Sequence, residues 1–351
     1  MASTVTKWCQ PGKEQYSIDL LDKLKPHEKS LMKVAEKNKG KKGKDIPSRI
    51  VINYFTKKYP RPTILQGPWQ LEYLVGETPN GIMRVYNLYD THLLPKKCGK
   101  GMMKADEWII GVLKSADVFV DVFVETAIPS KTFFGRKYIP IKHESRPGAL
   151  TDFIKKTDTC VKQKKQCPAP NSRIHGVDVR QIGYALEKQI RLAYPDEIDD
   201  VTNKVARNLI NMSVKILSST KMQKEIEDLP KCVFTKLIEK FTDNLEKCLL
   251  DINKPSMPYK TRIESLWMCI GSILMDTYLL GRLFKTFDVS RERGQPDRVH
   301  NAIIYTGSDH SVVYRDVLKS CGFNVVFKNK SSGVKNQCVN IRKMPYPLFR
   351  G

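Results

Sequence analysis

The sequence lacks the long apolar segments that mark membrane-spanning and secreted proteins. A transmembrane helix needs roughly eighteen consecutive apolar residues, whereas the apolar stretches at 109–113 and 118–124 are short and are bounded or broken by charge. Lys7, Lys13 and Asp19 occupy the region where a signal peptide has its apolar core. We therefore expect a protein without a transmembrane segment, made in a cytosolic compartment and staying there.

Cysteine pairs with the spacing of a zinc site are also missing. The chain has nine cysteines, an odd number, and no Cys-x-x-Cys pair. We expect reduced thiols, several of which fill the core. Cys160 and Cys167, followed by His175, fit no common zinc pattern. A disulfide between Cys160 and Cys167 is the alternative that we favour over a metal site if the environment is oxidising.

Acidic residues are scarce relative to basic ones. The chain has 60 Lys and Arg against 37 Asp and Glu, which gives a formal net charge of +23. Such a balance indicates contact with an anionic partner such as a lipid surface, an acidic protein surface or a nucleic acid. The sequence contains no recognised DNA- or RNA-binding motif. Nucleic-acid binding therefore rests on charge alone, and a specific nucleic-acid ligand is not expected.

The basic residues are densest at 23–58, and the segment KNKGKKGK at 37–44 contains no aromatic side chain. Proteins that bind single strands combine charge with stacking rings. We interpret residues 1–45 as a basic N-terminal helix or arm followed by a linker, with Pro26 interrupting the helical spacing. Two interpretations of this segment stay open, a solvated tether and an arm that binds an anion.

The remainder has the composition of a globular α/β protein, with 41% hydrophobic and 9% aromatic residues. Strands are expected at 70–76 and 82–89, and the Pro79-Asn80-Gly81 sequence between them is typical of a hairpin turn. The segment 117–124 is apolar on both faces, which is typical of a strand inside a parallel sheet. The other expected elements are helices at 104–115, 199–220, 231–250, 261–288 and 310–320, and strands at 299–306 and 323–328.

These elements predict an α/β fold with a mostly parallel central sheet flanked by helices. A helical insertion is expected at about 185–290, within a single domain that covers 46–351. The segment 299–328 reads as a strand–helix–strand unit in which Gly322 ends the helix.

Polar residues follow several predicted strands at the points where the strands end. Asp90 and His92 follow 82–89, Glu125 follows 117–124, and Asp309 and His310 follow 299–306. In open α/β sheets, ligands bind beyond the carboxyl ends of the strands. We therefore expect these side chains to converge on one site.

A short strand-like segment at 173–180 adds Asp178 and Arg180. Each polar residue also has a purely structural interpretation. Asp309 or Ser308 would cap the following helix, Asp178 and Arg180 would form a stabilising ion pair, and His175 would be an ordinary buried imidazole.

Two histidines and a carboxylate at one place suggest two kinds of chemistry. His92, Glu125 and His310, with Asp90 and Asp309 beside them, could ligate a divalent metal ion. Alternatively, a histidine acts as a general base that a carboxylate orients.

The pattern resembles the TraB/TIKI, ChaN-like and erythromycin-esterase-like group, in which an early Gly-x-x-His, a strand-end Glu and a late Gly-x-x-His form one cleft. Tyr89-Asp-Thr-His92, Glu125 and Gly307-Ser-Asp-His310 occupy these places, and Arg180 matches the group's arginine. The resemblance implies a hydrolase with His92, Glu125, His310 and Arg180 as catalytic residues. It would be either metal-dependent, with Arg180 holding substrate charge, or metal-free, with a histidine as the base toward water. Tyr89 stands where the group has glycine, and we expect its side chain to crowd the turn.

A broader likeness covers about two thirds of the chain. The segments VYNLYDTHLLPKKCG, DVFVETA, RIHGVDVRQ, MDTYLLGRLFK and AIIYTGSDHSVVYRDVLKSCGF are similar to uncharacterised proteins of large double-stranded DNA viruses of algae and amoebae. This resemblance implies a minor capsid or virion-associated structural protein, built on a hydrolase-like fold with a retained or vestigial cleft. Its expected partners are other capsid proteins and the anionic surface of an internal membrane. Its expected location is the capsid shell of the virion, reached from the host cytoplasm during assembly.

Overall fold

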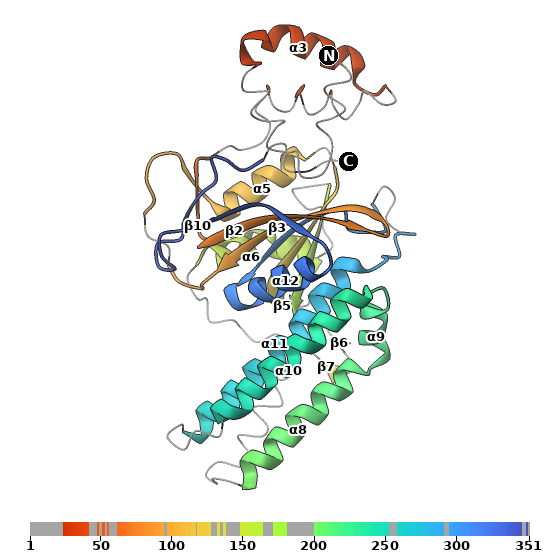
Figure 1. The fold of residues 1–351 in the computed structure, drawn as a ribbon, viewed down its shortest axis with the longest axis vertical. Coiled ribbons are helices and arrows are strands. Elements are labelled where there is room, and N and C mark those ends of the chain that lie inside the picture. Colours follow the sequence, from red (N-terminus) through yellow and green to blue (C-terminus); the bar gives the residue numbers. More distant parts are fainter. Residues whose placement is uncertain are drawn as a thin grey trace.

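A mixed six-stranded sheet forms the centre of the protein in the computed structural model (Figure 1). The structure describes residues 24–41, 48, 51–52, 55, 62–94, 97–116, 118–127, 132–133, 136–137, 148–163, 171–180, 200–252, 258–290, 295–345 and 349. The strands lie in the order β10-β2-β3-β9-β5-β8.

One half of this sheet is antiparallel. Strands β2 (Gln70–Thr78) and β3 (Gly81–Asp90) form the predicted hairpin. Its turn requires a glycine, because Gly81 has a φ of 106°. Strand β10 (Asn324–Lys330) pairs antiparallel with the outer side of β2.

The other half is parallel and carries the ends of the strands that build the site. Strand β9 (Asn301–Gly307) pairs with β3 and with β5 (Val120–Ala127), and β8 (Ser172–Asp178) pairs with β5. Every residue of β9 is buried, as expected for a strand that helices cover on both faces. The predicted α/β class is therefore confirmed. The sheet is mixed, with three parallel and two antiparallel pairings.

Helices cover both faces of the sheet (Figure 1). On one face, α5 (Ala105–Ser115) and α6 (Ala149–Gln163) supply Trp108 and Phe153 to a core that includes Tyr305 of β9. On the other face, α12 (Ser308–Ser320) and α11 (Tyr259–Phe284) pack in a second core. Small sheets complete the fold, built from β1 (Ile64–Gln66), β4 (Met102–Lys104) and β11 (Cys338–Asn340), and from β6 (Thr132–Phe133) and β7 (Arg136–Lys137).

The predicted helical insertion is present where the structure describes it. It consists of α8 (Asp200–Leu217), α9 (Thr220–Ile226), α10 (Lys231–Ile252) and α11. Long helices of this group extend away from the sheet in Figure 1. The part of the predicted insertion that precedes residue 200 lies outside the described residues.

Helix α11 is also the one described helix that is long and apolar enough to cross a membrane, over Ser265–Phe284. Within that window 72% of the residues are buried in the protein. This degree of burial is expected of a helix that forms the core beneath a sheet.

The N-terminal segment contains a short turn, η1 (Lys25–His27), and α3 (Glu28–Asn38). The helix begins at Glu28, two residues after Pro26, where the sequence predicted an interruption of the helical spacing. Ala35 packs in a small cluster with Val51, Ile52 and Phe55. Residues 1–23 and 42–47, which include most of the predicted basic arm, lie outside the described residues.

Six cysteines form three disulfides, so the expectation of reduced thiols is wrong for them. The pairs are Cys98–Cys338, Cys232–Cys321 and Cys248–Cys269, with Cα–Cα distances of 5.8, 5.4 and 6.4 Å. Their sequence separations are 240, 89 and 21 residues. Only the fold brings such distant residues together, so spacing alone could not identify them. Cys167 and the side chain of Cys160 lie outside the described part of the chain.

Candidate active site at the carboxyl ends of the parallel strands

Asp90 and His92 form a carboxylate–imidazole pair at the end of β3. His92 has a φ of 53°, a left-handed conformation that is uncommon for a residue other than glycine. Its backbone N–H donates to Asp90 Oδ2 over 2.7 Å, and its Nδ1 lies 2.8 Å from the same oxygen. The side chain of Asp90 is 1% exposed and that of His92 is 37% exposed. The turn therefore folds an accessible imidazole back onto a buried carboxylate.

Glu125 faces this imidazole from β5. A bulge between Val124 and Ala127 inserts one extra residue into the strand, and such bulges redirect side chains. Glu125 Oε2 lies 3.8 Å from His92 Nε2 and accepts a 2.6 Å hydrogen bond from the Gly307 N–H. Burial alone would raise the pKa of Glu125. The surrounding positive groups, Arg180 first among them, and the Gly307 N–H outweigh burial and lower the pKa to about 2.

Arg180 lies beyond the end of β8, and its guanidinium contacts three other side chains. Its Nε lies 2.9 Å from Asp178 Oδ1, and its Nη2 donates to Asp178 Oδ2 over 3.2 Å and to Glu125 Oε1. Its Nη1 lies 3.4 Å from His310 Nε2. The predicted Asp178–Arg180 ion pair is thus present. The guanidinium is committed to the protein instead of being directed at substrate charge.

His310 lies in the first turn of α12, beneath Arg180. Its Nδ1 is 2.6 Å from Asp276 Oδ1 of α11. Both side chains are almost completely buried. Asp276 is not among the site residues predicted from the sequence. A lone carboxylate within the apolar part of a long helix was the signal that could have found it.

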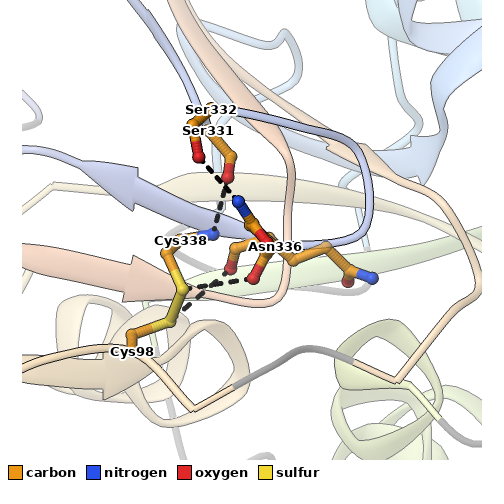
Figure 2. Close-up of a disulfide and its surroundings, with 6 residues drawn as sticks. Cys98, Ser331, Ser332, Asn336 and Cys338 are labelled. Atoms are coloured by element: carbon orange, nitrogen blue, oxygen red, sulfur yellow. Dashed lines mark hydrogen bonds between the residues drawn. A yellow bond between two sulfur atoms is a disulfide. The ribbon is translucent and has the colours of Figure 1, made fainter.

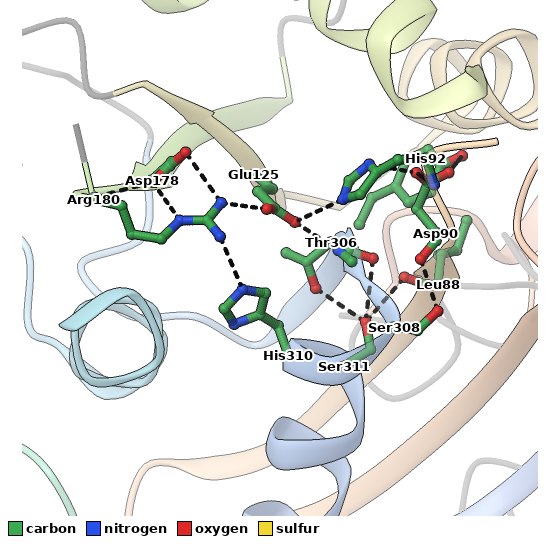
Figure 3. A network of polar contacts seen from close by, with 12 residues as sticks. Leu88, Asp90, His92, Glu125, Asp178, Arg180, Thr306, Ser308, His310 and Ser311 are labelled. Atoms are coloured by element: carbon green, nitrogen blue, oxygen red, sulfur yellow. Dashed lines mark hydrogen bonds and ion pairs between the residues drawn. The ribbon is translucent and has the colours of Figure 1, made fainter. Parts of the chain in front are cut away.

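Six of the seven ionisable groups form one continuous series of contacts, from Asp90 through His92, Glu125, Arg180 and His310 to Asp276, and Asp178 binds Arg180 beside it. Figure 3 shows the part of this series from Asp90 to His310. Gly307 lies at its centre. A Cβ atom there would be 3.1 Å from both Glu125 Oε2 and His92 Nε2, so a side chain at this position would crowd both groups.

The residues predicted as metal ligands do not form a metal site. Among the described residues, no three His, Cys, Asp or Glu side chains lie together as ligands for a metal ion. Glu125 binds a guanidinium and a backbone N–H, and both nitrogens of His310 face protein groups. Arg180, a cation, occupies the space between Glu125 and His310. This donor set does not fit a divalent ion.

Asp309 does not join the site. It is exposed in the first turn of α12, where a negative charge interacts favourably with the helix dipole. Gly307 is the N-cap residue, without a side-chain cap, so neither Asp309 nor Ser308 has the capping role considered from the sequence. Ser308 instead donates to the Asp90 backbone carbonyl over 2.7 Å and accepts from the Trp69 indole N–H.

Tyr89 does not crowd the turn, contrary to the expectation. Successive residues of a strand point to opposite faces of the sheet, so Tyr89 points away from the face of Asp90. Its ring is fully buried and packs edge-on against Trp69 at 6.1 Å, and its hydroxyl donates to the Glu72 carboxylate. The tyrosine is a core residue and leaves the site unobstructed.

His175 has the structural role that was its alternative interpretation. It lies in β8, where its Nε2 is 2.8 Å from Asp121 Oδ1 and its Nδ1 is 3.3 Å from Arg282 Nε of α11. Burial is the main cause that lowers the pKa of His175 to about 4. This neutral imidazole connects β5 and β8 to α11.

Comparison of the chain with protein-family models, with curated proteins and with solved structures gives no match.

Proposed function

We propose that this protein is a hydrolase that needs no metal ion and that uses His92 as a general base toward water. The contact between Asp90 Oδ2 and His92 Nδ1, at 2.8 Å, carries this proposal. A carboxylate on Nδ1 holds the proton there and leaves the lone pair on Nε2. The basic nitrogen is therefore Nε2, on the side of the ring that faces Glu125, in a side chain that is 37% exposed.

Glu125 complements the positive charge that His92 gains when it accepts a proton. With its pKa lowered to about 2, Glu125 is anionic wherever a histidine base works. Its Oε2 is 3.8 Å from the basic nitrogen. Charges fixed in place before the reaction stabilise the transition state without reorganisation.

Water is the nucleophile that fits this site best. Ser308 is one of the hydroxyl groups near the site, and it donates its proton to the Asp90 backbone carbonyl over 2.7 Å. Its oxygen also accepts from Trp69. A serine nucleophile would instead need its proton directed at the base.

The charges of the site favour a neutral carbonyl substrate such as an ester, lactone or amide over a phosphoester. Four carboxylates, those of Asp90, Glu125, Asp178 and Asp276, belong to it, and the Arg180 guanidinium binds two of them. Phosphoryl transfer relies on cations that clamp the phosphoryl group. In the described part of the site, the arginine is already bound to protein acceptors.

A panel of aryl esters, lactones and amides tests the proposal. Purified protein treated with a chelator should hydrolyse at least one compound, and His92→Ala should lower kcat by a hundredfold or more, about the usual contribution of a general base. His300→Ala is the matched control, because His300 lies at the opposite end of β9, and it should retain the rate. Equal rates for His92→Ala and the unaltered protein, or no hydrolysis of any compound, would refute the proposal.

A second proposal is that the protein belongs to the particle of a large double-stranded DNA virus, between capsid proteins and an anionic internal membrane. The sequence resemblance and the +23 charge support it. The three disulfides favour the same proposal, since such bonds persist in particles outside a reducing cytosol. Hydrolysis and a structural role can coexist in one chain.

Quantitative mass spectrometry of purified particles tests this second proposal. The chain should be present in many copies and should resist washing with detergent. Absence from the particle, or one or two copies per particle, would rule out a structural role.

A further inference from the structure

Asp276 is an isolated acid in the apolar part of the long helix α11. It is 3% exposed, and Leu274, Met275 and Leu279 around it are fully buried. A carboxylate in such surroundings carries a large desolvation penalty unless a partner compensates it. The partner is His310, whose Nδ1 lies 2.6 Å from Asp276 Oδ1.

Helix α11 also adjoins the site at a second position, Gly271. A Cβ atom on Gly271 would lie 2.9 Å from Cγ of Arg180 and 3.3 Å from its Cδ. The glycine therefore makes room for the stem of the arginine. One helix supports both Arg180, through Gly271, and His310, through Asp276.

The carboxylate determines which nitrogen of His310 carries the proton. With Nδ1–H donated to Asp276, the lone pair is on Nε2, which lies 3.4 Å from Arg180 Nη1. If Nε2 carried the proton instead, this contact would place two hydrogen-bond donors, His310 Nε2–H and Arg180 Nη1–H, opposite each other. The Tyr314 ring is nearly parallel to the His310 imidazole, with an interplanar angle of 19° and ring centroids 6.4 Å apart, and it restricts the orientation of the imidazole plane.

We propose that Asp276 is a positioning residue, which fixes the tautomer of His310 so that His310 orients Arg180 and, through it, Glu125 opposite His92. This inference rests on the proposed function for its catalytic meaning. It assigns to His310 a supporting role in place of the catalytic and metal-binding roles expected from the sequence.

The titration of His310 should report this arrangement. The groups facing it are Asp276 of α11, Arg180 beyond β8, Glu125 of β5 and Tyr314 of α12. Burial lowers the pKa of His310, but Asp276, with a smaller contribution from Glu125, outweighs burial and Arg180 and raises it above 6.5. Protonation of His310 opposes its contact with Arg180. The ordered arrangement of the site therefore requires the neutral imidazole, which is the form present at the alkaline end of the titration.

Nitrogen-detected NMR of the histidine side chains tests the inference without any substrate. In the unaltered protein at high pH, His310 should carry its proton on Nδ1. Asp276→Asn should lower the titration midpoint of His310 by about one pH unit or more. Asp309→Asn is the matched control, since it removes the exposed carboxylate next to His310 in the sequence, and it should leave the midpoint within a few tenths of a unit.

Two results would overturn the inference, namely a proton on Nε2 of His310 in the unaltered protein or an unchanged midpoint in Asp276→Asn. If Asp276→Asn does not fold, the tautomer of the unaltered protein decides alone. These spectra are independent of turnover. Absent hydrolysis together with the expected spectra would refute the proposed function and leave the positioning role of Asp276 intact.

Discussion

Glu125 illustrates how neighbouring groups hold a buried acid in its charged form. Its pKa falls from 4.5 to about 2 in the folded protein, so its ionised form binds the surrounding positive groups and the Gly307 N–H. A depressed folded-state pKa contributes stability above the unfolded-state pKa, and this contribution is lost as the pH falls toward the folded-state value. The stability contributed by ionised Glu125 is therefore lost as the pH falls from about 4.5 to about 2.

Urea unfolding at two pH values checks this linkage. Between about pH 5 and about pH 3, the unaltered protein should lose about 2 kcal/mol more free energy of unfolding than Glu125→Gln, which has no proton to bind. The same loss in both proteins would mean that Glu125 is not ionised in the way its contacts indicate.

Gly307→Ala should block the site while sparing the backbone. The φ of Gly307 is −55°, which alanine adopts freely, so any effect comes from the added methyl group at 3.1 Å from Glu125 Oε2 and His92 Nε2. We expect hydrolysis to fall at least tenfold and the free energy of unfolding to fall by about 1–2 kcal/mol.

Gly333→Ala is the matched control for this substitution, because a Cβ atom there has no neighbour within 4 Å. It should change neither activity nor stability. Full activity in Gly307→Ala, measured with the same substrate, would show that the reaction does not take place between His92 and Glu125 next to Gly307.

At the scale of elements, a disulfide fastens the segment that carries His92. Cys98, in the loop after β3, is bonded to Cys338 of β11, beside Ser331, Ser332 and Asn336 (Figure 2). Gln337 Nε2 donates to the Leu93 backbone carbonyl over 3.1 Å. The loop after His92 is thus held at two points against the segment that begins β11.

Replacing both cysteines, in Cys98→Ser with Cys338→Ser, should destabilise the protein by about 2–4 kcal/mol. It should also increase hydrogen exchange in residues 91–98. Chemical denaturation under non-reducing conditions measures the first effect, and exchange mass spectrometry measures the second. The cystine-linked peptide should be found in the digest of the unaltered protein, and its absence would contradict the pairing.

Most elements could be predicted from the sequence because their signals are local. The apolar, β-branched run of β5 indicates a buried parallel strand, and Gly322 after α12 has the positive φ, 86°, that a helix end favours. The unit 299–328 is a strand, helix and strand as expected. However, β10 pairs with β2 at the edge of the sheet instead of lying beside β9, because pairing depends on contacts far apart in the sequence.

The site was predictable only in part, for the same reason. His92, Arg180 and His310 follow strands and Glu125 lies near the end of β5, and strand ends in a parallel sheet meet at one edge. Asp276 belongs to a helix and gives no strand-end signal. The bulge that directs Glu125 and the role of Arg180 as the partner of two carboxylates depend on the register of β5 and β8, which local patterns do not determine.

At the scale of the whole molecule, the net charge of the chain is opposite in sign to the charge of the candidate site. The chain carries +23 overall, whereas the carboxylates of the site outnumber its one arginine. The proposed attachment to an anionic surface rests on the net charge of the chain.

Vesicle sedimentation measures the predicted attachment. The protein should sediment with vesicles that contain phosphatidylserine at low salt and should be released at about 0.5 M salt, where screening shortens the range of electrostatic attraction to a few ångströms. Neutral phosphatidylcholine vesicles are the control and should not retain it. Equal binding to both kinds of vesicle would remove charge as the reason for attachment.

The pairing of Asp90 with His92 is the central feature of the proposed mechanism, and the kcat of Asp90→Asn is its most direct test. With a chelator present and the best substrate from the panel, kcat should fall on the order of a thousandfold, because the imidazole loses the partner that holds its proton on Nδ1. KM should change little, and Asp309→Asn should keep the full rate. A kcat in Asp90→Asn close to that of the unaltered protein, or a rate abolished by the chelator and restored by a divalent ion, would contradict a metal-free base at His92.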